Sequence, residues 1–109
     1  MRLLVSEKAA LEELATWLRE RFGDRLSELG LFGSRARGEG SEESDLDVLV
    51  VVRGLSSVEA REIAQFRGDL LTRHGVLVSP FAVSSEHMAE LRRRERRIAR
   101  EIDRDAVPL

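Results

Sequence analysis

The sequence predicts an α+β fold, a small mixed β-sheet packed by helices, within one domain that spans residues 1–109. A chain of 109 residues has room for one hydrophobic core. With 42% hydrophobic and 35% charged residues, its composition is that of a globular protein and not of a disordered chain. The hydrophobic pattern gives the order helix, strand, strand, helix, strand, helix, which differs from the regular alternation of an α/β array.

The first element is a helix over residues 6–22. Leu11 and Leu18 belong to a set of apolar residues that recur at helical spacing, opposite charged positions. Ser6 is the expected N-cap, and Gly23 is the expected end of the helix.

Two strands are expected on either side of a polar loop. The first strand, over residues 25–32, alternates weakly and ends at Gly33. Residues 38–44 are all Gly, Glu or Ser, which indicates an exposed loop. Residues 45–52 read Asp-Leu-Asp-Val-Leu-Val-Val-Val, and the continuous apolar run after Asp47 predicts a central strand that is covered on both faces.

A second helix and a third strand follow. Ser56 and Glu59 form a capping-box pattern at the start of a helix that extends to about residue 74. The next strand, over residues 76–83, contains Pro80. Because proline has no N–H for the ladder, this strand is expected at a sheet edge or with a bulge.

One last helix is predicted after Ser84 or Ser85, either of which can cap it. Its apolar stripe comprises Met88, Leu91, Ile98 and Ile102. Seven arginines lie between these positions: Arg92, Arg93, Arg94, Arg96, Arg97, Arg100 and Arg104. Two interpretations stay open. The arginines form a solvated face, partly neutralised by pairs such as Arg97 with Glu101, or they bind RNA or another phosphate-rich molecule.

Asp45 and Asp47 are the candidate metal ligands. Residues two apart on a strand project from the same face, so the two carboxylates lie side by side where the apolar strand begins. Their repulsion is costly unless a cation compensates for it. Mg²⁺ suits this pair, because it binds one or two carboxylates together with substrate phosphates.

A phosphate-binding turn is predicted at Gly33 and Ser34. Glycine allows close backbone approach, and the N–H groups of a helical turn over residues 33–37 can face an anion. Arg35 and Arg37 add positive charge, and their guanidinium groups can hold phosphate oxygens through two bonds. One segment therefore offers donors to a triphosphate, and the other offers ligands to the metal that the triphosphate carries.

These residues resemble the signature of the polymerase-β-type nucleotidyltransferases, in particular their minimal form. The matching segments are Leu-Phe-Gly-Ser-Arg-Ala-Arg-Gly at residues 31–38 and Ser-Asp-Leu-Asp-Val-Leu-Val at residues 44–50, with ten residues between Gly-Ser and Asp-x-Asp. The resemblance implies a polymerase-β-like fold in which Gly33, Ser34 and either Arg35 or Arg37 contact the phosphates of an NTP, with ATP expected. It also implies that Asp45 and Asp47 ligate Mg²⁺ during transfer of a nucleotidyl group to an acceptor hydroxyl.

The resemblance further implies a partner, because minimal members of the family are typically paired with HEPN proteins in toxin and antitoxin systems, where they add AMP to a partner tyrosine. Catalytic members usually have a third carboxylate on a neighbouring strand, and no acid occurs in residues 75–83. Asp69, Glu86 and three glutamates of the loop, Glu39, Glu42 and Glu43, are possible substitutes. An alternative function is thus a binding module that regulates its partner by contact, with catalysis lost.

Composition excludes several other functions. Without cysteine there is no disulfide, no Cys-ligated zinc and no thiolate nucleophile. The net charge of −2 neither requires nor excludes a nucleic-acid partner, and the oligomeric state stays open. No stretch approaches the length of a membrane span, and Glu7 and Lys8 interrupt the N-terminal apolar run too early for a signal peptide. We therefore expect a cytoplasmic protein without a membrane partner.

Overall fold

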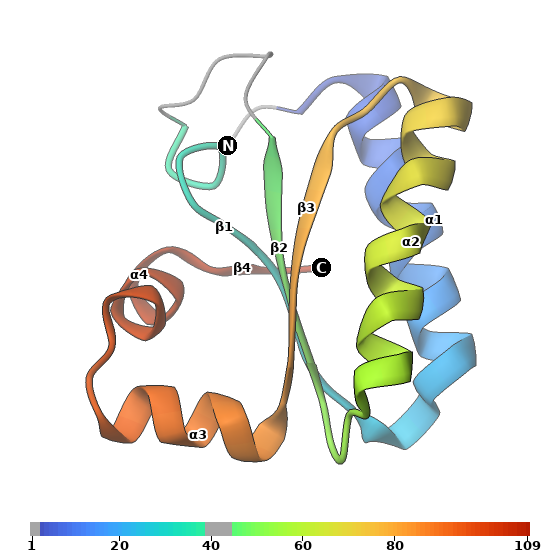
Figure 1. Ribbon diagram of the computed structural model, residues 1–109. Helices are drawn as coiled ribbons and strands as arrows, with labels where there is room; N and C mark the ends of the chain where they lie inside the picture. The colour runs from blue at the N-terminus through green and yellow to red at the C-terminus, as the bar shows by residue number, and fades with distance from the viewer. Residues whose placement is uncertain (1–2, 39–44) are drawn as a thin grey trace.

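A mixed sheet with helices on both faces forms the centre of the computed structural model, which describes residues 3–38 and 45–109 (Figure 1). In this part of the chain the sheet has four strands in the order β3-β2-β1-β4. They are β1 (Leu26–Phe32), β2 (Leu46–Val52), β3 (Val78–Ser84) and β4 (Val107–Pro108). β2 runs antiparallel to β1 and parallel to β3, while β4 is antiparallel to β1. The predicted α+β class is confirmed.

The residues of two strands correctly predict where those strands lie in the sheet. β2 lies between β1 and β3, as its uninterrupted valines predict, and all of its apolar side chains are buried. β3 forms an edge of the sheet and carries Pro80 opposite Val48. The short strand β4 was not expected, because two residues give no periodic signal.

Two helices, α1 (Val5–Phe22) and α2 (Ser57–His74), cover one face of the sheet (Figure 1). The even-numbered valines of β2 point into this layer, since alternate residues of a strand face opposite sides. They form one core cluster with apolar residues of both helices: Val48, Val50 and Val52 with Leu14, Leu18, Ile63 and Leu70.

The other face is covered by α3 (Ser85–Arg93) and α4 (Arg97–Asp105), so the prediction of one continuous helix is wrong. The chain turns at Glu95, a non-glycine residue with a φ of 53°. Met88 from α3 and Ile102 from α4 both pack against Leu49 and Phe32. A straight helix rises about 1.5 Å per residue and would carry Ile102 away from this small sheet. Burial of both apolar segments therefore favours the turn.

The helix caps agree with the sequence at α2 and differ at α1. The Glu59 N–H donates to the Ser56 hydroxyl over 3.1 Å, and the Ser56 N–H donates to the Glu59 carboxylate over 3.0 Å. The prediction of Ser6 as N-cap is wrong, because α1 begins at Val5 with Leu4 as the capping position. There the Glu7 carboxylate accepts the Leu4 N–H over 2.8 Å.

In the described part of the chain, five of the seven C-terminal arginines form ion pairs with acidic residues, as a solvated helix face predicts. Arg92 bridges Glu28 and Asp103, and Arg93 and Arg94 both pair with Glu90. The predicted pair of Arg97 with Glu101 is not among the ion pairs of the described residues, where Arg100 instead approaches Glu95 at 3.5 Å. Within the same residues, no helix is long and apolar enough to cross a membrane.

Candidate functional site

The end of β1 and the start of β2 bring Gly33 and Asp47 together. Asp47 lies opposite Phe32 in the antiparallel register, so the next residue of the chain, Gly33, turns beside it. Gly33 has a φ of 80°, a left-handed conformation that favours glycine. A Cβ atom at this position would overlap Oδ2 of Asp47 and would lie 3.2 Å from its Cγ. Two features therefore require glycine here, namely the backbone conformation and the adjacent carboxylate.

Asp47 faces the layer formed by α3 and α4. It lies on the same face of β2 as Leu49 and Val51, whose side chains pack on that layer. Asp47 is half-buried and Asp45 is exposed. Burial raises the pKa of the Asp47 carboxyl above its usual value, and the negative charges of Asp45 and Glu101 raise it further. The site thus concentrates negative charge around a partly desolvated oxygen.

This pair of carboxylates fits a divalent cation. Within the described part of the chain, no ion pair joins Asp45 or Asp47 to an arginine, lysine or histidine, so their mutual repulsion is not compensated. The same residues contain no group of three or more acidic or histidine side chains that could hold a metal alone. Mg²⁺ matches these donors, because it needs only one or two carboxylates when phosphate oxygens and water supply the rest.

The turn after Gly33 is a single helical turn, as predicted, and it does not continue as a helix. The Arg37 N–H donates to the Gly33 carbonyl over 3.2 Å, and the Gly38 N–H donates to the Arg35 carbonyl over 3.2 Å. Ser34 follows Gly33 at the start of this turn and is partly exposed. The turn therefore presents the backbone of Gly33 and Ser34 next to Asp47, in the place where phosphate binding is predicted.

The two arginines of the turn point to opposite layers. Arg35 is 5% exposed, and its guanidinium forms two bonds of 2.7 Å with the two oxygens of Glu7 in α1. Arg37 is 31% exposed and bonds over 2.7 Å to Asp105 at the end of α4. The pKa of Asp105 is lowered to about 2 by its bonds to Arg104 and Arg37. Phosphate contact by either arginine stays a prediction.

As the sequence indicates, the neighbouring strand β3 has no third carboxylate beside Asp47. Ser79 of β3 lies beside Asp47 in the parallel register. Besides Asp45, the acid whose charge reaches Asp47 is Glu101 of α4, which the sequence pattern assigned to a pair with Arg97. Glu101 enters this region because the chain turns between α3 and α4, and no glycine or proline marks that turn. Three of the proposed substitutes, Glu39, Glu42 and Glu43, lie outside the described residues.

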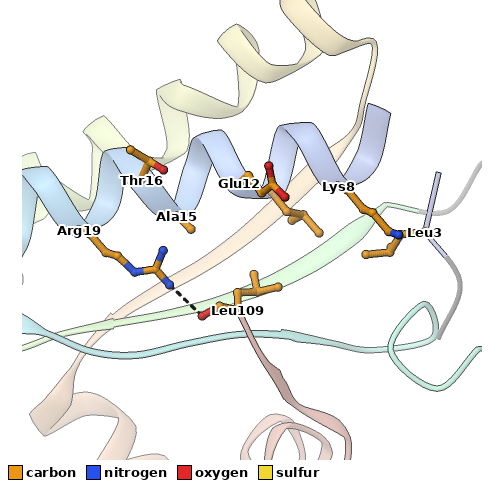
Figure 2. Close-up of a pocket in the computed structure, with 8 residues that line it drawn as sticks. Leu3, Lys8, Glu12, Ala15, Thr16, Arg19 and Leu109 are labelled. Carbon is orange, nitrogen blue, oxygen red and sulfur yellow. Dashed lines mark hydrogen bonds between the residues drawn. The ribbon is translucent and has the colours of Figure 1, made fainter. Parts of the chain in front are cut away.

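A separate cavity of about 450 Å³ lies between α1 and the C-terminal residue (Figure 2). Its lining includes Leu11 and Ala15 of α1, and the Arg19 guanidinium donates to the Leu109 carbonyl over 2.9 Å. This cavity belongs to the face of the sheet that α1 and α2 cover. Asp47 points to the other face, so the cavity is not part of the candidate site.

Comparisons with known proteins find a matching sequence family and a similar solved structure. The sequence profile of a family described as a nucleotidyltransferase domain matches residues 11–103, which include Gly33, Ser34, Asp45 and Asp47. A solved structure described as a candidate minimal nucleotidyltransferase is similar, with a TM-score of 0.59 and 30% identity. The similarity covers 94% of this chain and 91% of that structure.

Two archaeal proteins are also similar in sequence. MJ0604 of Methanocaldococcus jannaschii, named as a candidate protein adenylyltransferase, is 32% identical over 82 residues, which are 75% of this chain and 78% of that protein. The protein adenylyltransferase MntA of Thermococcus cleftensis is 64% identical over 33 residues, which are 30% of this chain and 31% of MntA.

Proposed function

We propose that this chain transfers AMP from ATP to a hydroxyl group of a partner protein. The premise is that the chain belongs to the nucleotidyltransferase domain family and is a nucleotidyltransferase. The observation that carries the proposal is the contact between the backbone of Gly33 and the carboxylate of Asp47. It supports the proposal because a phosphate-binding turn at Gly33 would lie directly beside a metal ligand at Asp47. The names of the two archaeal relatives support AMP as the transferred group and a protein as the acceptor.

In this mechanism the turn binds and orients the triphosphate. The backbone of Gly33 and Ser34 contacts the phosphates, and the positive charge of Arg37 beside the turn favours the polyanion. The acceptor oxygen attacks the α-phosphorus in line, the bond from that phosphorus to the bridging oxygen breaks, and pyrophosphate leaves. The acceptor proton passes to solvent. Fixed charges that match the transition state supply most of the acceleration.

Asp45 and Asp47 would hold Mg²⁺ in this proposal. When bound, the ion neutralises phosphate charge and activates the reacting oxygens. The surroundings of Asp47 support this role, because burial first, and then the charges of Asp45 and Glu101, raise the pKa of its carboxyl, and a nearby cation would oppose all three effects.

The acceptor is proposed to be a hydroxyl of a HEPN-type partner, with the two proteins acting as a toxin and antitoxin pair in the cytoplasm. This part rests on the resemblance of residues 31–50 to minimal nucleotidyltransferases. The chain itself has no tyrosine to act as an acceptor of that type. We treat residues 1–109 as one domain, to which the partner supplies the acceptor.

A second function is favoured by one observation. Ser79 stands beside Asp47 on β3, where catalytic relatives usually have a third acid. A chain without that acid can bind its partner and a nucleotide without transferring AMP. Binding without turnover is therefore the competing function.

A double-label experiment separates the two functions. The chain is incubated with a HEPN-type partner, Mg²⁺, and ATP labelled at either the α- or the γ-phosphate. AMP transfer predicts that the α-label, and not the γ-label, becomes attached to the partner. The Asp45→Asn/Asp47→Asn variant is the control and should leave the partner unlabelled. A partner that binds but acquires neither label would instead support the binding function.

A further inference from the structure

One buried ion pair joins the candidate site to the opposite helical layer. Glu7 and Arg35 are both buried, and the side chain of each is 5% exposed. Arg35 Nη1 donates to Glu7 Oε2 and Arg35 Nη2 donates to Glu7 Oε1, both over 2.7 Å. The residues are 28 positions apart in the chain. The pair therefore connects the first turn of α1 to the turn that follows β1.

Stability alone is a poor explanation for this pair. Removal of two charges from water is costly, and well-packed apolar residues of similar volume are often as stabilising as a buried ion pair. A paired guanidinium and carboxylate also fix a relative position, because two parallel bonds set both the distance and the orientation of the two groups. The pair is therefore suited to setting the position of the segment that carries Arg35.

The Glu7 end of the pair is rigidly held. Glu7 Oε1 also accepts the N–H of Leu4 over 2.8 Å, so the same carboxylate caps the start of α1. The bonds to Arg35 keep the pKa of Glu7 below its usual value and thus keep the carboxylate charged. α1 itself is anchored in the core through Leu14 and Leu18, which are almost fully buried. Arg35 is therefore bonded to a fixed point of the fold.

The Arg35 end lies within the turn that the nucleotide would contact. Arg35 follows Ser34 directly, and its carbonyl accepts the Gly38 N–H over 3.2 Å. On its other side the turn is held by the bond of 2.7 Å from Arg37 to Asp105. The turn is thus clamped between α1 and α4, with Gly33 packed against Asp47.

We propose that Glu7 acts through Arg35 as a positioning residue for the nucleotide, by holding the backbone of Gly33 and Ser34 at the correct place relative to Asp47. This inference rests on the proposed function. Reactions of this class require the reacting groups to be aligned closely, and a displacement of about 1 Å can cost on the order of a hundredfold in rate. Glu7 touches neither nucleotide nor metal in this account.

The test replaces the ion pair by apolar side chains. In Glu7→Leu/Arg35→Met both charges of the buried pair are removed together, so the variant is expected to fold, as checked by circular dichroism and thermal unfolding. Calorimetric titration with Mg²⁺ and a non-hydrolysable ATP analogue then measures nucleotide affinity. We expect the Kd to rise by about tenfold or more, while the unfolding temperature falls only by the small amount expected when the Leu4 N–H loses its Glu7 acceptor.

A matched control uses the pair of Arg25 with Glu59. It also has two guanidinium–carboxylate bonds, of 2.8 and 2.9 Å, but it lies where β1 begins and β2 ends, at the opposite end of these strands from Gly33. Arg25→Met/Glu59→Leu should leave the Kd unchanged. The single variant Glu7→Asp, which keeps the charge on a shorter side chain, should have an intermediate Kd.

Two results would overturn the inference and leave the proposed function intact. If Glu7→Leu/Arg35→Met binds the analogue as tightly as the wild type, the pair serves only the fold. If the control pair raises the Kd as much, the effect is general destabilisation and not positioning. A wild-type chain that does not bind the analogue at all would contradict the proposed function itself, and the positioning role with it.

Discussion

Substitution of Gly33 by alanine tests the contact on which the site depends. Alanine at a φ of 80° would incur the left-handed penalty of about 1–2 kcal/mol. Its Cβ would also overlap Oδ2 of Asp47 and approach the Asp47 Cγ to 3.2 Å. Overpacking of this kind typically costs a further ~1–3 kcal/mol. Gly33→Ala should therefore destabilise the fold by about 2–5 kcal/mol, part of which arises from displacement of Asp47 or of the turn.

Gly75→Ala is the matched control. Gly75 has a φ of 66°, and no atom lies within 4 Å of the position that its Cβ would occupy. This variant should incur only the conformational penalty of about 1–2 kcal/mol. Urea unfolding of both variants gives the two free energies, and calorimetric titration with Mg²⁺ and an ATP analogue gives the two affinities. Only Gly33→Ala should weaken nucleotide binding.

A double-mutant cycle isolates the part of this stability cost that comes from the Asp47 carboxylate. In the Asp47→Ala background the overlapping atoms are gone, so Gly33→Ala should cost about as much stability as Gly75→Ala, roughly 1–2 kcal/mol. The reasoning is refuted if Gly33→Ala costs no more than Gly75→Ala in the wild-type background. It is equally refuted if the Asp47→Ala background leaves the cost of Gly33→Ala unchanged.

Three further predictions concern the scaffold that holds the site. Ser56→Ala removes the acceptor of the Glu59 N–H and should lower the free energy of unfolding by about 1 kcal/mol in urea titration. Ile63→Ala leaves a cavity in the core between α2 and the sheet, where Ile63 is fully buried, and should cost about 2–5 kcal/mol by the same measurement. Acid should also destabilise the protein through Glu59, whose pKa is lowered from 4.5 to about 2, chiefly by the bonds from Arg25. Because the folded-state pKa is the lower one, this contribution is complete above about pH 4.5 and is lost as pH falls towards about 2. The free energy of unfolding should therefore decline less over this pH range in Glu59→Gln than in the wild type. An equal decline in the two proteins would contradict the role given to Glu59.

The parts of the fold that were predictable carry local signals. The apolar run after Asp47 identified a central strand because both faces of β2 are buried. Pro80 identified an edge because it cannot donate to a ladder. Ser56 and Glu59 identified the start of α2 because both capping bonds form between neighbouring residues.

The remaining features depend on contacts between distant residues. The turn at Glu95 has no glycine or proline, and it forms because α3 and α4 both pack on Leu49 and Phe32. The pair of Glu7 with Arg35 joins two segments whose relative position only the folded chain defines. The charge of Glu101 reaches Asp47 for the same reason, so spacing along the sequence could not identify this acid.

Titration of the folded chain with a non-hydrolysable ATP analogue, with and without Mg²⁺, tests the central claim most directly. The claim is that Asp45 and Asp47, beside the Gly33 turn, form a metal-dependent nucleotide site. We predict that the wild type binds the analogue only with Mg²⁺ and that Asp45→Asn/Asp47→Asn does not bind it. Equal binding by that variant, or none by the folded wild type in the presence of its partner, would contradict the account.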